Sequence, residues 1–263
     1  MTGDGARRGS VGFIGGGRIT RIILSGWQRA GEVPDDVVVC DVDGDALERI
    51  EGLGTTARVV DRRIEEAAAC RVVFLAVHPP VIRSISGTLT AALGPETVVV
   101  SLAPKLTIAA LSSMLGGFSR VIRVIPNAAS LVGAGYNPVV FGERVMPADR
   151  AEVAALLAPL GEAPEVAEPE LEAYAILTAM GPTYFWPQLY QLVALAEEFG
   201  LAKTPAYTGM ERMLSGAVAT MRAGLSLEEA MGLVSVRPLA SLEPQILEGY
   251  EVNLRKLYEA IKP

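Results

Sequence analysis

Short apolar runs rich in valine and isoleucine recur along the first 165 residues. Between them lie mixed stretches, such as 44–52 and 81–92, that are long enough for helices. Runs that are apolar nearly throughout are typical of parallel strands that helices cover on both faces. The pattern predicts strands at 10–14, 37–40, 57–60, 72–77, 97–101 and 120–125. We expect them to form one parallel, doubly wound sheet with crossover helices.

The pattern changes near residue 168, beyond which strand-like runs disappear and Ala, Leu, Met and Glu dominate. Gly200 suits a helix end, and Thr204 followed by Pro205 suits an N-cap and first turn. The composition predicts helices over 168–199, 204–223, 226–234 and 239–261. Pro182 and Pro187 inside the first of these helices predict a kink. A proline- and glutamate-rich stretch precedes them, so we divide the chain into an α/β domain, 1–166, and an all-α domain, 167–263.

Composition and charge narrow the function classes. Half of the 263 residues are hydrophobic, which is enough for a sizeable core. The net charge of −7 argues against nucleic acid as a partner, and the apolar runs are shorter than the about 20 residues of a membrane span. One histidine and the separated Cys40 and Cys70 form no metal-ligand pattern, so we expect no metal and two buried thiols. Because no secretory signal precedes the first strand, the expected compartment is the cytoplasm.

A glycine-rich turn follows the first predicted strand. Gly15, Gly17 and Thr20 give the pattern G-x-G-x-x-T at the start of a helix. Such a turn lets a pyrophosphate approach the backbone, and it needs a small residue where the helix meets the sheet. The pattern therefore indicates a Rossmann-type dinucleotide-binding domain, and a packing turn is the alternative. The expected cofactor contacts in this turn are Ile14, Gly15, Gly16, Gly17, Arg18 and Ile19.

Asp41 ends the second predicted strand. A carboxylate at this place can accept hydrogen bonds from the adenosine ribose and would repel a 2′-phosphate, which favours NAD over NADP. Against this, Arg18, Arg62 and Arg63 can each reach the adenosine end and neutralise a phosphate. NAD is the favoured cofactor and NADP the alternative, with Asp41 and Arg63 as expected contacts.

The fourth predicted strand runs into the motif LAVHPPVI at 75–82. The carboxyl end of this strand borders the nicotinamide in a doubly wound sheet, so Ala76, Val77, His78 and Pro79 are expected to line the cofactor. At this motif the chain resembles the pyrroline-5-carboxylate reductase family. The resemblance rests on four motifs in the family's order: IGGGRI at 14–19, AVHP at 76–79, VIRVIPN at 121–127 and AMGPTY at 179–184.

This resemblance implies a reductase that transfers hydride from NAD(P)H to the C=N carbon of a cyclic imine carrying a carboxylate. It implies that Asn127 lies near the nicotinamide and that Ser101 and Ala103 lie over the cofactor at the end of the fifth strand. His78 stands where the family has lysine and is expected to contact ribose or phosphate. Two alternatives remain open: that the Asn127 side chain serves only the backbone of a turn, and that only the backbone of His78 contacts the cofactor.

The resemblance also extends to the helical half. It implies a substrate site that includes Gly181, Pro182 and Thr183, with the hydroxyl of Tyr184 as a secondary proton donor. In the family the C-terminal helices interlock between two protomers. A homodimer or a higher homo-oligomer through these helices is therefore expected, and apolar helix faces agree with it.

The chain departs from the family at one loop. Members of the family have the loop sequence S-P-G-G-T-T or S-P-G-G-A-T where this chain has VSVRPLAS at 234–241. The lost glycines leave an anion-binding nest of backbone amides in doubt. In one interpretation Arg237 grips a substrate carboxylate, Ser235 supplies a small hydroxyl residue, and Ser241 bonds the imine nitrogen. In the other, the substrate has changed and Arg237 is a solvated surface cation.

Three functions stay open at this point. The first is a pyrroline-5-carboxylate reductase type of enzyme that acts on a cyclic imine. The second is an imine or keto reductase of specialised metabolism with a larger, more apolar substrate. The third is a dinucleotide-binding regulatory protein without catalysis. A more remote alternative is a deazaflavin-dependent NADP oxidoreductase, which shares the first domain type.

Overall fold

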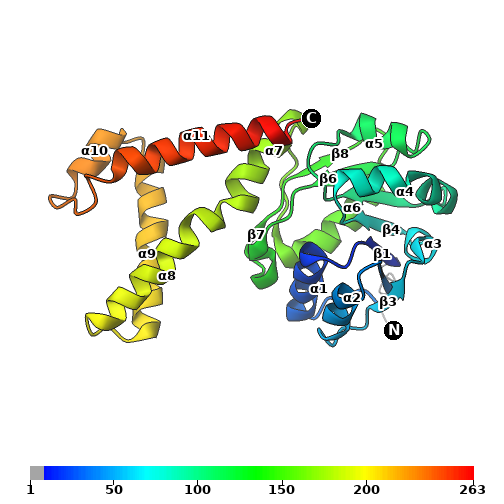
Figure 1. The fold of residues 1–263 in the computed structure, drawn as a ribbon, viewed down its shortest axis with the longest axis horizontal. Coiled ribbons are helices and arrows are strands. Elements are labelled where there is room, and N and C mark those ends of the chain that lie inside the picture. Colours follow the sequence, from blue (N-terminus) through cyan, green and yellow to red (C-terminus); the bar gives the residue numbers. More distant parts are fainter. Residues whose placement is uncertain (1–8) are drawn as a thin grey trace, which may run out of the picture. The chain divides into compact units, whose positions relative to one another are not determined.

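The computed structural model describes residues 9–263 and separates into two compact units (Figure 1). The first comprises the chain up to Met180 together with Tyr258–Pro263, and the second is Gly181–Leu257. The predicted boundary between 166 and 167 stays a prediction. Residues 1–8, on which the expectation of a cytoplasmic compartment partly rests, lie outside the described residues.

The first unit is built on a seven-stranded sheet with the order β3-β2-β1-β4-β5-β6-β8. Six strands are parallel, and β8 runs antiparallel to β6 at one edge. The bounds are β1 Val11–Ile14, β2 Val37–Asp41, β3 Arg58–Asp61, β4 Val72–Leu75, β5 Val98–Ser101, β6 Val121–Val124 and β8 Val139–Phe141. The six predicted strands and the doubly wound parallel sheet are therefore confirmed.

Three short strands were not predicted. They are β8 and a separate two-stranded ladder of β7 Gly135–Tyr136 and β9 Gly161–Glu162. Each has only two or three residues and lies beside glycine or proline. Such segments carry too few side chains for a periodic pattern to show.

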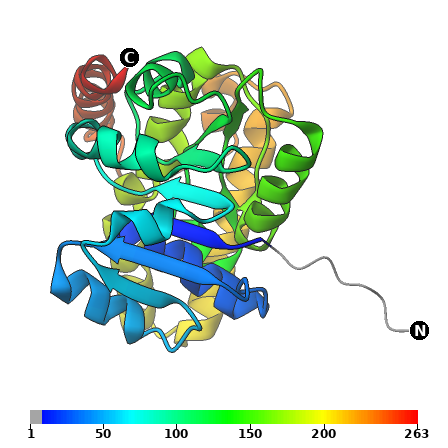
Figure 2. The same cartoon turned by 90° about the vertical axis from the view of Figure 1, so that its right-hand side faces the viewer.

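Helices cover both faces of the sheet, and Figure 2 shows the strands of this unit side by side with helices around them. One core cluster contains Phe13, Phe74 and Trp27, with the two phenylalanine rings stacked 4.9 Å apart. The indole Nε1 of Trp27 donates to the Leu156 carbonyl over 2.7 Å. The bounds are α1 Arg18–Ala30, α2 Gly44–Glu51, α3 Ile64–Ala68, α4 Pro79–Ala92, α5 Ile108–Met114, α6 Pro147–Leu157 and α7 Leu171–Tyr174, with the 3₁₀ turns η1 Ala128–Val132, η2 Ala158–Leu160 and η3 Glu168–Glu170 and the π-helical turn η4 Ala175–Met180.

The second unit consists of helices, as predicted. They are α8 Pro182–Glu198, α9 Lys203–Arg222, α10 Leu227–Gly232 and the greater part of α11 Glu243–Ile261. Gly200 ends the first of these in a left-handed conformation, as expected, with φ at +96°. None of the helices between residues 9 and 263 is both long and apolar enough to cross a membrane.

Two details of the helix prediction are wrong. The single helix expected over 168–199 is divided into η3, α7, η4 and α8, and α8 begins at Pro182, which has no backbone N–H to continue a preceding helix. Thr204 is not an N-cap, because the cap is Ala202 and α9 already begins at Lys203. Pro205 therefore lies inside the first turn, where its missing N–H has no helical partner to lose.

Candidate functional site

The glycine-rich turn joins the carboxyl ends of β1, β2 and β4. Gly15 has φ at +110°, and its N–H donates to the Cys40 carbonyl over 2.8 Å. A Cβ at Gly15 would lie 2.6 Å from the Ala76 carbonyl oxygen, which is part of the turn after β4. The Ala76 N–H in turn donates to the Ile14 carbonyl over 2.8 Å. Both the backbone conformation and the close approach therefore require glycine at this position.

Gly17 meets a different requirement. It is the N-cap of α1, it is exposed, and a Cβ there would meet no atom within 4 Å. The bare helix N-terminus leaves backbone N–H groups open to an anion, which is what a pyrophosphate needs. Thr20 is fully buried, and its hydroxyl donates to the Gly15 carbonyl over 2.5 Å. A threonine in place of the usual glycine or alanine thus has its polar atom satisfied.

Asp41 lies at the carboxyl end of β2 and faces the turn. One carboxylate oxygen accepts from the Gly16 N–H over 2.6 Å. The other accepts from the N–H groups of Val42 and Asp43, over 2.6 Å and 3.0 Å. Its neighbour Asp43 caps α2, accepting from the Asp45 N–H over 3.1 Å, as expected for a helix start.

The basic residues near Asp41 are exposed. Arg62 takes a left-handed conformation with φ at +57°, and its N–H donates to the Asp41 carbonyl over 3.0 Å. Arg63, which the sequence suggested for the cofactor, pairs with Glu66 over 2.5 Å. Arg18 begins α1 beside the turn. The structure thus gathers both the acidic and the basic candidates at one edge of the sheet.

The turns after β4 and β5 lie at the same edge. Ala76 and Val77 are half-buried, whereas His78 is an exposed N-cap of α4 whose side chain makes no capping bond, and Pro79 is the first residue of that helix. Ser101 ends β5, and its hydroxyl accepts from the Ala103 N–H over 3.3 Å. Both are buried.

Asn127 follows β6 and caps η1. Its side-chain oxygen accepts from the Ala129 N–H over 3.1 Å, and its side-chain nitrogen donates to the Tyr136 carbonyl over 2.7 Å. The amide therefore serves the local backbone, which was the alternative raised from the sequence. A contact to the cofactor stays a prediction.

The candidates of the second unit lie apart in the sequence. Gly181 precedes α8 and Pro182 and Thr183 begin it, and the ring of Tyr184 stands edge-on to that of Tyr250 with centroids 5.9 Å apart. Burial raises the pKa of Tyr184, so its hydroxyl stays protonated at neutral pH.

Ser235 and Arg237 border a cavity of about 870 Å³ between α10 and the start of α11. Its other lining residues are Leu227, Glu228, Met231, Gly232, Val234, Glu243, Ile246 and Leu247. Arg237 forms an ion pair with Glu243, and Ser241 is exposed on the same connecting loop. Within this part of the chain, neither Ser241 nor Tyr184 is among the residues that line the cavity.

The sequence interpretation missed a buried charged group. Arg123 is fully buried in the middle of an apolar strand and contacts Glu168 and Glu172. The signal was present, because a charge inside the run VIRVI is unusual. Within residues 9–263, no group of three or more His, Cys, Asp or Glu side chains is placed to hold a metal ion.

The ends of β1, β2, β4, β5 and β6 meet where the strand order reverses between β1 and β4. This is the position at which open parallel sheets bind nucleotides. The fold and the turn therefore define a Rossmann-type protein with a candidate dinucleotide site. The family described as NADP oxidoreductase coenzyme F420-dependent matches residues 10–105, which is only part of the first unit.

Relatives match far more of the chain. The pyrroline-5-carboxylate reductase of Mycobacterium tuberculosis is 33% identical over 218 residues, which cover 80% of this chain and 73% of that protein. The enzyme of the same name from Escherichia coli is 29% identical over 199 residues, with 75% of this chain and 73% of that protein covered. This chain belongs to the pyrroline-5-carboxylate reductase family, so the resemblance found in the sequence is confirmed.

Solved structures agree on the fold. Pyrroline carboxylate reductase from Plasmodium falciparum with NADP bound superposes with a TM-score of 0.74 at 20% identity, over 98% of this chain and 97% of that one. A pyrroline-5-carboxylate reductase from Coxiella burnetii gives a TM-score of 0.67 at 27% identity, over 97% and 94%. The predicted fold, an α/β sheet followed by helices, is thus also that of these structures.

Proposed function

We propose that this chain is an NAD(P)H-dependent reductase of a cyclic imine, with 1-pyrroline-5-carboxylate or a related imine as substrate. The proposal rests on the junction of β1 with α1, where Gly15, Gly17 and Asp41 provide a tight turn, a bare helix N-terminus and a carboxylate. These residues fit a dinucleotide, which supplies the hydride when it is bound. Family membership then indicates the C=N group as the acceptor.

Each part of the chain has a separate task in this proposal. The amides at the start of α1 bind the pyrophosphate, Asp41 accepts from the ribose, and the turns at 76–79 and 101–103 border the nicotinamide. Asn127 holds the turn after β6 in place. Ser241 donates a hydrogen bond to the imine nitrogen, with Tyr184 as a second donor. No imidazole is required, because hydride transfer needs orientation and one proton donor.

The roles of the two hydroxyls can be tested by removal. Ser241→Ala should lower turnover with the imine without weakening NADH binding. Ser215→Ala is the matched control, because Ser215 is also exposed and its hydroxyl bonds carbonyl groups of its own helix. Tyr184→Phe with Tyr190→Phe as control tests the second donor. Turnover that is unchanged in both site variants would remove these hydroxyls from the mechanism.

A further question is whether the substrate carries a carboxylate and which residues would bind it. In the proposal Arg237 leaves Glu243 and grips the carboxylate, with Ser235, Gly181, Pro182 and Thr183 completing the substrate contacts. The pairing of Arg237 with Glu243 and the largely apolar cavity beside it favour a second candidate, an imine that is larger, more apolar and lacks a carboxylate.

A panel of cyclic imines of increasing ring size, each with and without a carboxylate, separates the two candidates. Preference for the carboxylates, and its loss in Arg237→Met, supports the first. Equal or better turnover of the uncharged imines supports the second. Dinucleotide binding without turnover of any imine would overturn both and favour a regulatory protein.

We further propose NAD as the preferred cofactor, because the Asp41 carboxylate would repel a 2′-phosphate. The ratio of kcat/KM for NADH over NADPH should exceed one and should fall in Asp41→Asn. Equal use of both cofactors by the unaltered protein would refute the preference, and the exposed Arg18, Arg62 and Arg63 would then be the residues to neutralise.

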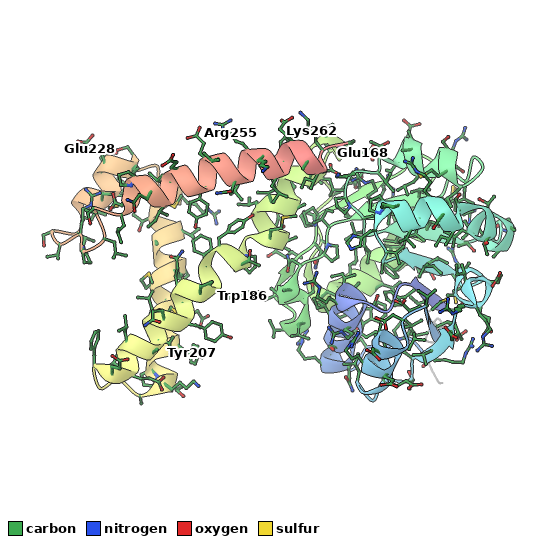
Figure 3. All side chains as sticks on the ribbon, viewed as in Figure 1. Glu168, Trp186, Tyr207, Glu228, Arg255 and Lys262 are labelled. Atoms are coloured by element: carbon green, nitrogen blue, oxygen red, sulfur yellow. The ribbon has the colours of Figure 1, made fainter. Side chains whose placement is uncertain are left out.

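Self-association through the second unit is the last part of the proposal. Large apolar side chains are exposed there, among them Phe199 at 79%, Leu227 at 75% and Val236 at 71%. Trp186 and Tyr207, labelled in Figure 3, border one hollow between α8 and α9. So much exposed apolar surface favours a homodimer or a higher homo-oligomer. Light scattering after gel filtration measures the mass, and a monomer at micromolar concentration would refute this part.

A further inference from the structure

A buried charge cluster lies beside the loop that connects β5 to α5. Arg123 stands on β6 opposite Ser101 of β5, and no part of its side chain is exposed. One guanidinium nitrogen pairs with Glu172 of α7, whose side chain is 1% exposed. The other pairs with Glu168 of η3 over 3.1 Å (Glu168 is labelled in Figure 3). All three residues belong to the first unit.

The two carboxylates also bind the loop itself. The oxygen of Glu172 that contacts Arg123 accepts from the Lys105 N–H over 3.2 Å. The oxygen of Glu168 that contacts Arg123 accepts from the Ile108 N–H over 2.7 Å. One arginine thus fixes two carboxylates, and each carboxylate fixes one backbone amide of the loop.

The loop needs such an external constraint. Lys105 has φ at +73°, a left-handed conformation that residues other than glycine seldom take and that surrounding structure must enforce. At the other end of the loop, the Leu102 N–H donates to the Leu75 carbonyl over 3.1 Å, which joins the loop to the end of β4. The loop is therefore held at both ends, by β4 and by the carboxylates.

The cluster is not arranged for stability alone. Within the described residues, the Arg123 Nε and one oxygen of Glu172 are buried without a hydrogen-bond partner. Replacing a buried ion cluster by well-packed apolar residues is often neutral or stabilising, so the burial of these charges is not in itself evidence that they serve stability. What the charges provide is a fixed geometry for two amides.

We propose that Arg123, Glu168 and Glu172 are positioning residues that set the β5–α5 loop, and with it Ser101 and Ala103, against the nicotinamide half of the cofactor site. The catalytic part of this proposal rests on the proposed function. The structural part, a loop whose position depends on the buried cluster, stands independently of it. A displaced loop would let the nicotinamide leave its reactive orientation while the pyrophosphate and adenosine contacts stay intact, so kcat should fall and dinucleotide affinity should not.

The test uses the full chain with Glu172→Gln, and with Glu165→Gln as the matched control. Glu165 also pairs with an arginine of the first unit, Arg150 at 2.9 Å, but it is exposed. Hydrogen exchange of the Lys105 and Ile108 amides is measured first, with the amides of β5 as an internal reference. We expect Glu172→Gln to speed exchange of the Lys105 amide while β5 and the control variant keep the rates of the unaltered protein.

Kinetics then separate positioning from folding. Glu172→Gln should lower kcat with the imine about tenfold or more, the size of effect that a misplaced reactant produces, and leave the Kd for NADH close to that of the unaltered protein. If Glu172→Gln does not fold, Glu168→Gln replaces it, because that side chain is 29% exposed and its loss is milder; the amide to follow is then Ile108.

Two results would overturn the proposal: unchanged exchange of the loop amides in a folded variant, or faster exchange with unchanged kcat. If the unaltered protein reduces no imine, the proposed function fails separately. The cluster is still tested then, because NADH should slow exchange across the loop in the unaltered protein and not in the variant.

Discussion

Alanine should have different effects at two glycines of the same turn: at Gly15 it should lower the stability of the protein, and at Gly17 it should weaken dinucleotide binding. Gly15→Ala places a Cβ 2.6 Å from the Ala76 carbonyl oxygen and 2.8 Å from a methyl group of Val77, at a backbone φ of +110°. The left-handed conformation costs about 1 to 2 kcal/mol and the overpacking about 1 to 3 kcal/mol. We expect the free energy of unfolding to fall by about 2 to 5 kcal/mol, a large part of the about 5 to 15 kcal/mol of a typical domain.

Gly17→Ala should lower that free energy by no more than about 1 kcal/mol, the cost of alanine at an N-cap, because φ is −71° and no atom lies within 4 Å of the added carbon. The Cβ would instead stand at the helix N-terminus that the pyrophosphate approaches. A steric cost of about 1 to 3 kcal/mol in the complex weakens NADH binding by about fivefold to about 150-fold.

Gly31→Ala is the control for the first variant. Gly31 is also left-handed, with φ at +70°, but it has no neighbour within 4 Å, so only the conformational cost remains. Urea unfolding followed by circular dichroism measures stability, and NADH fluorescence measures binding. The reasoning is refuted if Gly15→Ala is no less stable than Gly31→Ala, or if Gly17→Ala binds NADH as well as the unaltered protein.

Three further predictions concern buried polar groups. Asp149 is 2% exposed and pairs with Arg71, so Asp149→Asn should lower the free energy of unfolding by about 3 kcal/mol. Glu165→Gln, at an exposed ion pair, should lower it by less than about 1 kcal/mol, and equal losses in urea unfolding would contradict this reasoning. Trp27→Phe leaves a buried carbonyl without its donor and should lose about 2 kcal/mol, and an unchanged urea midpoint would contradict it. Burial raises the pKa of the Cys40 and Cys70 thiols to about 11 from 9.0, so both should resist Ellman's reagent in the folded protein at pH 8. As the pH rises, the thiols of the unfolded chain lose their protons before those of the folded protein. The free energy of unfolding should therefore fall between about pH 9 and 11, and it should fall less in a variant with serine at both positions. Native thiols that react as fast as unfolded ones would refute this.

The strands of the sheet could be predicted because each is specified by residues that are contiguous in the sequence. Each parallel strand is buried on both faces and so appears as an uninterrupted apolar run, and the turn after the first run carries its own glycines. Gly200 and Asp43 likewise act within their own helices. The class of cofactor follows from these segments and from Asp41 alone.

What could not be predicted depends on residues that are distant in the sequence. Arg123 and Glu172 are 49 positions apart, and only the folded chain brings their charges together. A kink was predicted at Pro182, but not the end of one helical segment and the start of another, because the stretch on either side has good helix formers. The pairing of Arg237 with Glu243 depends on the path of a connecting loop, and no periodic pattern describes such a path.

The double use of Asp41 constrains attempts to redesign the cofactor preference. The carboxylate that would discriminate between the two coenzymes also ties the Gly16 amide to the end of β2, so it shapes the turn before any ligand arrives. Replacing it by serine or arginine to admit a 2′-phosphate would release that amide at the same time. Engineering this protein to prefer NADPH therefore needs two substitutions. One residue must bind the 2′-phosphate, and another must restore a hydrogen-bond acceptor for the Gly16 N–H.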